Sequence, residues 1–342
     1  MKILLYTDNH YCATSSAIKS QGTKYSARLE NQIKSINWVE QLAKDNNVDL
    51  IVCLGDFFDK PHLTDEELTA LKEINWNNNI LHYFIVGNHE AISSDLIFNT
   101  VKALEDKNRI IVNSPTSIEL DNVELDFLPY IIENNRKSLA EYFGPQGSKK
   151  RIILSHNDIK GIRYGAFESK EGFEISDIEA NCDLFVNGHL HNGTWITKKI
   201  RNLGNLTGQD FKEDAFKYSH YASIIDLDTL QMTDFENPYA FNIYKFEITT
   251  EKDLAKLNKL KTNAIVSIKC NEVFVEAIKN KLETLNAIHS RLSVIPETEV
   301  TTDSTNVDCF SIDHLKEFAR SSKDNIENSL ILNQELQIIC SN

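Results

Sequence analysis

Residues 186–193, VNGHLHNG, place His189 and His191 two positions apart, directly after an apolar run. Imidazole is the side chain that most often binds metal ions in proteins. Two histidines so close in sequence can address a common site only where the backbone turns sharply, which Gly188 and Gly193 permit. A single histidine is more often an ordinary surface or core residue, so the pair needs support from the rest of the chain.

Four further apolar runs are followed at once by side chains that bind metal ions. After the runs at 2–7, 49–54, 80–86 and 151–155 come Asp8 and His10, then Asp56 and Asp59, then Asn88 and His89, and finally His156. Each has an ordinary explanation by itself, such as a turn residue, a left-handed backbone position or a core histidine. Five separate runs that all end in oxygen and nitrogen donors instead indicate a two-metal site of the kind that suits Mn, Fe or Zn.

The elements that must position these residues alternate along the chain. The runs named above and the run at 183–187 are short and almost continuously apolar, as is typical of strands buried on both faces. Helical periodicity predicts a helix that ends at Asn46. Thr64 and Glu67 form a capping-box signature for a second helix running toward Trp76, and a third is expected over 94–107. Alternating strands and helices predict a layered α/β domain whose ligand site lies at the carboxyl ends of the strands.

Composition narrows the class of protein. The 342 residues carry a formal net charge of −14, which argues against a generally basic protein that coats nucleic acid but not against a site that holds phosphate through metal ions. The six cysteines include no CxxC pair and are expected to be reduced thiols. No signal peptide is visible, and no apolar stretch approaches the roughly 20 residues of a membrane span. A cytoplasmic protein without a membrane partner is expected.

The order D-x-H, GDxxD, GNHE, H and GHxH resembles the calcineurin-like metallophosphoesterase family over about residues 1–235. The resemblance implies a β-sandwich core flanked by helices and two divalent metal ions. Mn²⁺ is the expected ion, with Mg²⁺, Fe²⁺ and Zn²⁺ as alternatives. The implied ligands are Asp8, His10 and His191 for one ion, Asn88, His156 and His189 for the other, and Asp56 as a bridge between both.

Two further residues receive roles from the same resemblance. His89 is implied to face the scissile phosphate as a catalytic residue, and Asp59 to orient metal ligands rather than bind an ion. Serine/threonine protein phosphatases share GNHE, but they typically read GDxVDRG and RGNHE, whereas this chain has GDFFDK and Val86 before Gly87. The arginines that would hold a phosphoryl dianion are therefore missing.

The C-terminal third predicts additional units. Residues 1–238 are expected to form the phosphoesterase domain, 239–300 a small α/β capping domain of strand, helix and strand, and 301–342 a linker with C-terminal helices. Residues 251–300 carry eight Lys or Arg against seven Asp or Glu, so a plain accessory domain and a DNA-contacting cap are both compatible with this charge. Core, cap and helical tail together resemble the nuclease subunit of SbcCD-type DNA repair complexes, in the bacterial or phage branch.

This resemblance implies a DNA nuclease that acts in repair, recombination or replication. Its implied partners are DNA, an SMC-like coiled-coil ATPase bound through the C-terminal helices, and a second copy of the chain. Those amphipathic helices could equally fold back on the core. A phosphodiesterase for small nucleotides and a non-catalytic structural or regulatory subunit remain the alternatives. In this family a Gly-Ser turn often contacts phosphate, and Thr207 or the backbone around Gly204 would have to replace it here.

Overall fold

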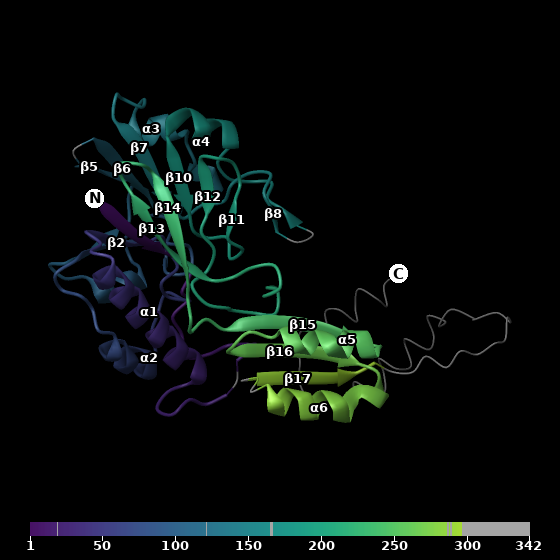
Figure 1. The fold of residues 1–342 in the computed structure, drawn as a ribbon. Coiled ribbons are helices and arrows are strands. Elements are labelled where there is room, and N and C mark those ends of the chain that lie inside the picture. The colour runs from purple at the N-terminus through teal and green to yellow at the C-terminus, as the bar shows by residue number, and fades with distance from the viewer. Residues whose placement is uncertain (19, 121, 165–166, 286, 288, 296–342) are drawn as a thin grey trace, which may run out of the picture. The chain divides into compact units, whose positions relative to one another are not determined.

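Two six-stranded sheets carry the residues expected to bind metal (Figure 1). The computed structural model describes residues 1–295 apart from 19, 121, 165–166, 286 and 288. The chain separates into a unit of Met1–Ile295 and a unit of Pro296–Asn342, and the second lies outside the described residues. The expected C-terminal helices of 301–342 therefore lie outside them as well.

The first sheet runs in the order β14-β13-β1-β2-β3-β4. Its strands are β1 (Lys2–Tyr6), β2 (Leu50–Cys53), β3 (Leu81–Ile85), β4 (Arg109–Val112), β13 (Tyr221–Asp226) and β14 (Gln231–Glu236). Strands β1 to β4 are parallel, whereas β13 and β14 are antiparallel to their neighbours. The parallel arrangement brings the carboxyl ends of β1, β2 and β3 to one edge, where Asp8, Asp56 and Asn88 follow.

The second sheet runs in the order β11-β12-β10-β7-β6-β5. Its strands are β5 (Thr116–Leu120), β6 (Val123–Leu128), β7 (Lys150–Ser155), β10 (Leu184–Asn187), β11 (Thr194–Trp195) and β12 (Ile200–Asn202). Strands β6, β7, β10 and β12 are parallel, so His156 and His189 follow neighbouring strands at one edge. The five strands predicted from the apolar runs are all confirmed.

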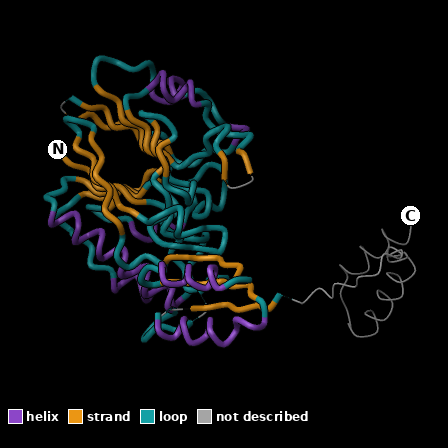
Figure 2. Tube along the Cα trace, turned by 45° about the vertical axis from the view of Figure 1, so that its right-hand side comes forward, coloured by secondary structure: helices purple, strands orange, loops and turns teal. Residues whose placement is uncertain are grey.

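The two sheets pack face to face with helices outside them, as Figure 2 shows. Side chains alternate along β1: Ile3 and Leu5 enter the core between the sheets, where they join residues such as Ile152 of β7, while Leu4 points toward the helices. Helices α1 (Ala27–Asp45) and α2 (Asp65–Ala70) cover the first sheet, and α3 (Leu139–Phe143) and α4 (Ile175–Asn181) cover the second. The predicted layered α/β fold is thus confirmed.

Local sequence signals set some helix ends and fail at others. Helix α1 ends at Asp45, with Asn46 as its C-cap at the expected end, and Thr64 and Glu67 form both hydrogen bonds of the capping box of α2. Helix α2 passes into a 3₁₀ turn, η1 (Leu71–Glu73), and stops before Trp76. The helix expected over 94–107 is wrong, since only the 3₁₀ helix η2 (Thr100–Leu104) forms there.

The failed helix has a local cause. The carboxylate of Asp95 accepts hydrogen bonds from the Ser93 hydroxyl and from the backbone N–H of Ile97, and Leu96 adopts a φ of 56°. Such side-chain to backbone bonds compete with helix formation. The helical turn begins only after Asn99, whose side chain accepts a bond from the backbone N–H of Lys102.

Residues after 240 form a separate three-stranded sheet within the first unit. Strands β15 (Asn242–Ile248), β16 (Ala264–Cys270) and β17 (His289–Val294) are parallel, and the connections contain α5 (Glu251–Ala255), η4 (Lys256–Lys259), η5 (Glu272–Phe274) and α6 (Val275–Thr284). The remaining elements are the short strands β8 (Arg163–Tyr164) and β9 (Phe167–Glu168) and the turn η3 (Glu133–Asn135). Within the described residues, no helix has the length and apolarity needed to span a membrane.

Candidate metal centre

Four of the predicted ligand residues lie in an uncommon backbone conformation. Asp8, His10, Asp56 and His189 have φ values of 49°, 46°, 48° and 73°. Non-glycine residues rarely adopt positive φ, and where they do so together they cluster at functional sites. The sharp turn expected in VNGHLHNG is therefore made by His189 itself, because neither Gly188 nor Gly193 has a positive φ.

Gly87 and Gly188 instead allow these loops to approach one another closely. A Cβ atom on Gly188 would lie 2.2 Å from the Thr7 hydroxyl and 2.9 Å from Nδ1 of His156. A Cβ atom on Gly87 would lie 2.1 Å from Oδ1 of Asp56. These contacts are shorter than side chains tolerate, so the loops can meet at this edge only with glycine at both positions.

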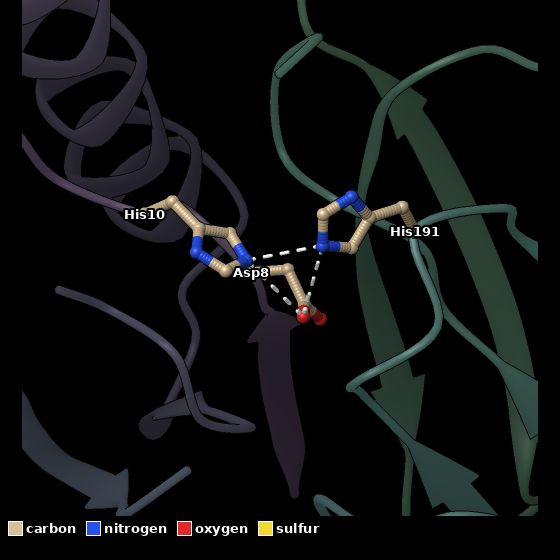
Figure 3. Close-up of side chains that lie close together, drawn as sticks. All are labelled: Asp8, His10 and His191. Carbon is tan, nitrogen blue, oxygen red and sulfur yellow. Dashed lines mark hydrogen bonds and ion pairs between the residues drawn. The ribbon is translucent and has the colours of Figure 1, made fainter. Parts of the chain in front are cut away.

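The first cluster joins the two sheets (Figure 3). Nε2 of His10, after β1, lies 3.1 Å from Nε2 of His191, which follows β10 in the other sheet. Oδ1 of Asp8 lies 3.8 Å from the former nitrogen and 3.9 Å from the latter. The structure thus brings together the three residues predicted to bind the first ion.

The second cluster lies beside the first. Oδ2 of Asp56 is 3.1 Å from Nε2 of His156 and 3.9 Å from Nε2 of His10, so this carboxylate reaches both clusters. Oδ1 of Asn88 lies 3.0 Å from Nδ1 of His189. Asp56, His156 and His189 form a second group whose ligand atoms lie within 4.8 Å of one another. All seven predicted ligand residues therefore meet at one edge of the two sheets.

The donor atoms fit divalent ions. Oδ1 of Asp8 and Nε2 of His156 are buried and have no hydrogen-bond partner in the described part of the chain; the latter is near Asp56 but makes no hydrogen bond with it. Buried polar atoms are rarely left in this state unless an ion or water completes them. Nε2 of His10 and Nε2 of His191 lie 3.1 Å apart, close enough for both nitrogens to hold one ion.

Each predicted histidine ligand uses its other ring nitrogen for an outer partner. Nδ1 of His10 lies 3.1 Å from Oδ1 of Asp59, and Nδ1 of His156 donates to the carbonyl of Leu54 at 2.7 Å. Because a carbonyl only accepts, the proton of neutral His156 sits on Nδ1 and the Nε2 lone pair faces the cluster. Asp59 therefore contacts the ring nitrogen of His10 that faces away from His191, which is the place expected for a residue that orients a metal ligand.

Two outer partners escaped the sequence analysis. Oδ1 of Asp158 lies 3.3 Å from Nε2 of His189, and Oε1 of Glu213 lies 3.7 Å from Nδ1 of His191. Asp158 follows His156 by two residues, which is the one signal that could have suggested it. Glu213 lies in a loop with no motif, and only the folded chain brings it to His191.

The cluster favours positive charge, as the pKa values of the metal-free protein show. Burial alone would lower the pKa of His10, but its hydrogen bond to Asp59 and the nearby carboxylates of Asp8 and Asp56 raise it to about 10. Burial also opposes the charged form of His156, yet the neighbouring Asp56 raises its pKa to about 9. Protons thus occupy the positions where divalent ions would bind.

The pKa values of the carboxylates at the two clusters are shifted in the opposite direction, below their ordinary values. Burial acts to raise the pKa of Asp8, but the imidazole of His10, 3.8 Å away, and the charges of His156 and His191 lower it to about 2. The pKa of Asp56 is held below its usual range, against the effect of burial, by His156 and His10. Both predicted ligands therefore remain ionised and ready to bind a cation at neutral pH.

The predicted catalytic residue, His89, lies at the exposed side of the clusters. Its backbone N–H donates to Oδ1 of Asp56 at 3.0 Å, and its Nδ1 donates to the carbonyl of Asp59 at 2.9 Å. Its ring meets that of His10 edge to face, with centroids 4.6 Å apart. Although His89 could join His10 and Asp59 in a third ligand group, its Nδ1 is already bonded to a carbonyl. Among the described residues Nε2 of His89 has no hydrogen-bond partner, so it is available to a substrate.

A cleft of about 450 Å³ opens over these residues. His10, His89 and His191 line it together with Thr14, Ser16, Arg28 and Lys212, among others. Thr207 does not reach a substrate here, since it is 1% exposed and its hydroxyl donates to Asn31 and accepts from the N–H of Phe241. Of the two expected replacements for a phosphate-contacting serine, Thr207 is therefore wrong, and the backbone around Gly204 stays a prediction.

Comparison with known proteins identifies the family. Residues 1–225 match the calcineurin-like phosphoesterases. Exonuclease subunit 1 of Enterobacteria phage T4 is 22% identical over 167 residues, which are 47% of this chain and 48% of the phage protein. The chain thus spans about half the length of that curated relative.

Two solved structures are similar to part of this chain. A dimetal phosphatase from Danio rerio superposes with a TM-score of 0.42 and 11% identity, covering 69% of this chain and 96% of that one. The calcineurin-like phosphoesterase YfkN from Bacillus subtilis gives a TM-score of 0.35 and 12% identity, covering 69% and 88%. With the family match extending over 225 of the 342 residues, and the ligand clusters at the sheet edge, the chain belongs to the calcineurin-like phosphoesterase family.

Proposed function

We propose that the chain is a two-metal phosphodiesterase that cleaves DNA, the nuclease subunit of an SbcCD-like complex in repair, recombination or replication. One observation supports hydrolase activity above all. Two ligand clusters share Asp56 beneath an open cleft, and in the described structure Nε2 of His89 has no hydrogen-bond partner at the side of that cleft. The similarity to a phage exonuclease subunit favours DNA as the substrate.

Each residue contributes a defined part of the chemistry. Divalent ions, when bound, neutralise phosphate charge and activate water for in-line attack on phosphorus. Asp8, His10 and His191 would hold one ion and Asn88, His156 and His189 the other, with Asp56 between them. The ions in this proposal are Mn²⁺, with Mg²⁺, Fe²⁺ or Zn²⁺ as alternatives.

His89 acts on the substrate rather than on the ions. Its Nδ1 bond to the Asp59 carbonyl fixes the ring, so Nε2 is presented toward the cleft. In its protonated form the imidazole can donate to an equatorial phosphate oxygen or to the departing alkoxide. Asp59 orients His10 through its carboxylate and His89 through its carbonyl, so one residue positions both.

The partners belong to the same proposal. An SMC-like coiled-coil ATPase would dock on the helices expected in 301–342, and a second copy of the chain would complete the assembly in the cytoplasm of a bacterial or phage-infected cell. Deleting residues 305–342 should abolish co-purification with such an ATPase and leave metal affinity unchanged. Unchanged co-purification would place the ATPase contact elsewhere on the chain.

The test of the nuclease is Mn²⁺-dependent degradation of end-labelled duplex DNA. We expect wild type to degrade it and His89→Ala to do so about 10²- to 10⁴-fold more slowly with metal content unchanged. His62→Ala is the matched control, because His62 is exposed and belongs to neither cluster. An unchanged rate in His89→Ala would contradict its catalytic role.

A small chromogenic phosphodiester separates the alternatives. The cleft has little excess positive charge, because the side chains of Arg28 and Lys212 are balanced by those of Asp59 and Asp210. Such a lining suits a small nucleotide as well as a DNA strand. Hydrolysis of the small diester with intact DNA, even with an ATPase partner added, would favour a nucleotide phosphodiesterase. Metal binding without either activity would favour a non-catalytic structural or regulatory subunit.

A further inference from the structure

Gln209 lies where the two halves of the first cluster meet. It is 7% exposed and belongs to the segment between β12 and β13. Its side-chain nitrogen lies 3.3 Å from the carbonyl of Asp8, 3.2 Å from that of Asn9 and 2.9 Å from that of Thr207. Its side-chain oxygen accepts a hydrogen bond from the guanidinium of Arg28. Since carbonyls only accept and guanidinium only donates, this amide has one possible orientation.

Side chains of helix α1 bond the same stretch of backbone. Arg28 donates to the carbonyl of His10 at 3.0 Å, and the side-chain nitrogen of Gln32 lies 2.8 Å from the carbonyl of Asn9 and 2.6 Å from that of His10. Three consecutive carbonyls, of residues 8–10, are therefore hydrogen-bonded by the side chains of Gln209, Arg28 and Gln32. This bonding stabilises the left-handed conformation that Asp8 and His10 need to direct both side chains at one point.

Gln209 also reaches the other half of the cluster. Its backbone N–H donates to Oε1 of Glu213 at 3.0 Å, and the same oxygen lies 3.7 Å from Nδ1 of His191. A single residue thus bonds the loop that carries Asp8 and His10 and the carboxylate that faces His191. Within the described residues, Gln209 has no hydrogen bond to Asn88, His156 or His189.

We propose that Gln209 is a positioning residue that sets the spacing of His10 and His191 and so the affinity of the first cluster for its ion. The two nitrogens belong to loops of different sheets, and neither loop is covalently close to the other. Their 3.1 Å separation therefore depends on cross-links such as Gln209. This proposal rests on the two-metal site of the proposed function, but not on DNA as the substrate.

Two substitutions of Gln209 distinguish its hydrogen bond with Arg28 from its hydrogen bonds to the backbone carbonyls. Gln209→Glu keeps an acceptor for Arg28 but replaces the donors to the carbonyls of Asp8 and Asn9 with an oxygen that repels them. Gln209→Leu removes every side-chain bond at similar volume. The matched control is Gln41→Leu, because Gln41 is exposed on α1 and its side chain bonds only its neighbour Asp45 in the described structure.

The measurement is calorimetric titration of the metal-free full chain with Mn²⁺, and with Co²⁺ to follow the visible spectrum of the bound ion. Each Gln209 variant is made in two backgrounds: His156→Ala, which leaves the first cluster intact, and His10→Ala, which leaves the second. We expect about 10- to 100-fold weaker binding at the first cluster, with a changed Co²⁺ spectrum, and binding within about 2-fold of the parent at the second.

Two results would overturn the proposal. One is unchanged affinity and spectrum at the first cluster in both Gln209 variants. The other is an equal loss at both clusters, which would show a general loosening of the fold, checked independently by the thermal midpoint of the metal-free variants. DNA is absent from the titration, so a chain that binds two ions but leaves DNA intact, even with an ATPase partner added, would refute the nuclease and leave the role of Gln209 standing.

Discussion

Oδ1 of Asp158 lies 3.3 Å from Nε2 of His189, on the opposite edge of the ring from the Nδ1 that faces Asn88. A carboxylate behind a ligand histidine fixes the ring and increases the basicity of the ligand nitrogen. Asp158 should therefore support the second cluster from outside, although no sequence motif points to it.

Replacing Asp158 with alanine should weaken metal binding at the second cluster by about 10-fold or more and leave the first unchanged. Asp158→Asn keeps an acceptor for Nε2 and should recover part of the loss. Titration with Mn²⁺ in the His10→Ala background measures this cluster alone, with the exposed Asp228→Ala as the control. Equal affinities in Asp158→Ala and the control would show that the contact has no influence on the metal.

Metal affinity should rise with pH. In the metal-free protein the pKa of His10 is about 10 and that of His156 about 9, both above the usual value near 6.5. A metal ion must displace these protons, so binding should strengthen as the pH rises from 6.5 toward 9 and should release protons into the buffer. Titrations in buffers of different ionisation enthalpy count the protons released, and a pH-independent affinity would contradict the assigned ligands.

The stability of the metal-free protein should change in the opposite direction. A histidine whose pKa is raised by folding stabilises the fold fully below its unfolded pKa, and this contribution is lost as the pH rises through the folded pKa. For His10 and His156 the window runs from about 6.5 to about 9 or 10. We expect the urea midpoint of the metal-free chain to fall across that window, and Mn²⁺ to reverse the fall.

Asp56→Ala should impair both clusters together. Its carboxylate lies within 3.9 Å of His10 and 3.1 Å of His156, so its loss removes a shared donor. Calorimetry should find no site that retains the wild-type affinity, in contrast to His89→Ala, which should bind both ions. One site of unaltered affinity in Asp56→Ala would show that Asp56 serves a single ion.

Far from the clusters, Arg151 should be needed for the fold itself. It is 2% exposed, donates to Glu124 at 2.9 Å and to the carbonyl of Gly144 at 2.9 Å, and lies 3.1 Å from the buried Asp126. Arg151→Met leaves that carboxylate without its partner and should lower the free energy of unfolding by about 3–5 kcal/mol.

The control for Arg151 is the double variant Arg151→Met with Asp126→Asn, which removes the uncompensated charge and should recover part of the stability. Urea unfolding of the metal-free proteins measures both changes, and Mn²⁺ affinity of the folded variants should stay at the wild-type value. A loss below about 1 kcal/mol in the single variant would mean that water or relaxation replaces the arginine.

The sequence by itself determined five strands of the two large sheets and the donor residues that follow them, because burial on both faces and donor residues at strand ends are local patterns. The resemblance to the family then singled out seven of those donors as metal ligands. The sequence also determined the capping box of α2, which depends on Thr64 and Glu67 alone. Where local signals conflict, the prediction from the sequence was wrong. Residues 94–107 have helical periodicity, but the hydrogen bonds of the Asp95 side chain form a turn there instead.

Only the tertiary structure decided how those residues face one another. His10 and His191 meet across two sheets, and the φ values of Asp8 and His10 depend on Arg28, Gln32 and Gln209. The outer partners Asp158 and Glu213 follow from the same packing. Contacts between residues far apart in the chain leave no periodicity or spacing in the sequence, so the supports of the metal centre become visible only when the chain has folded.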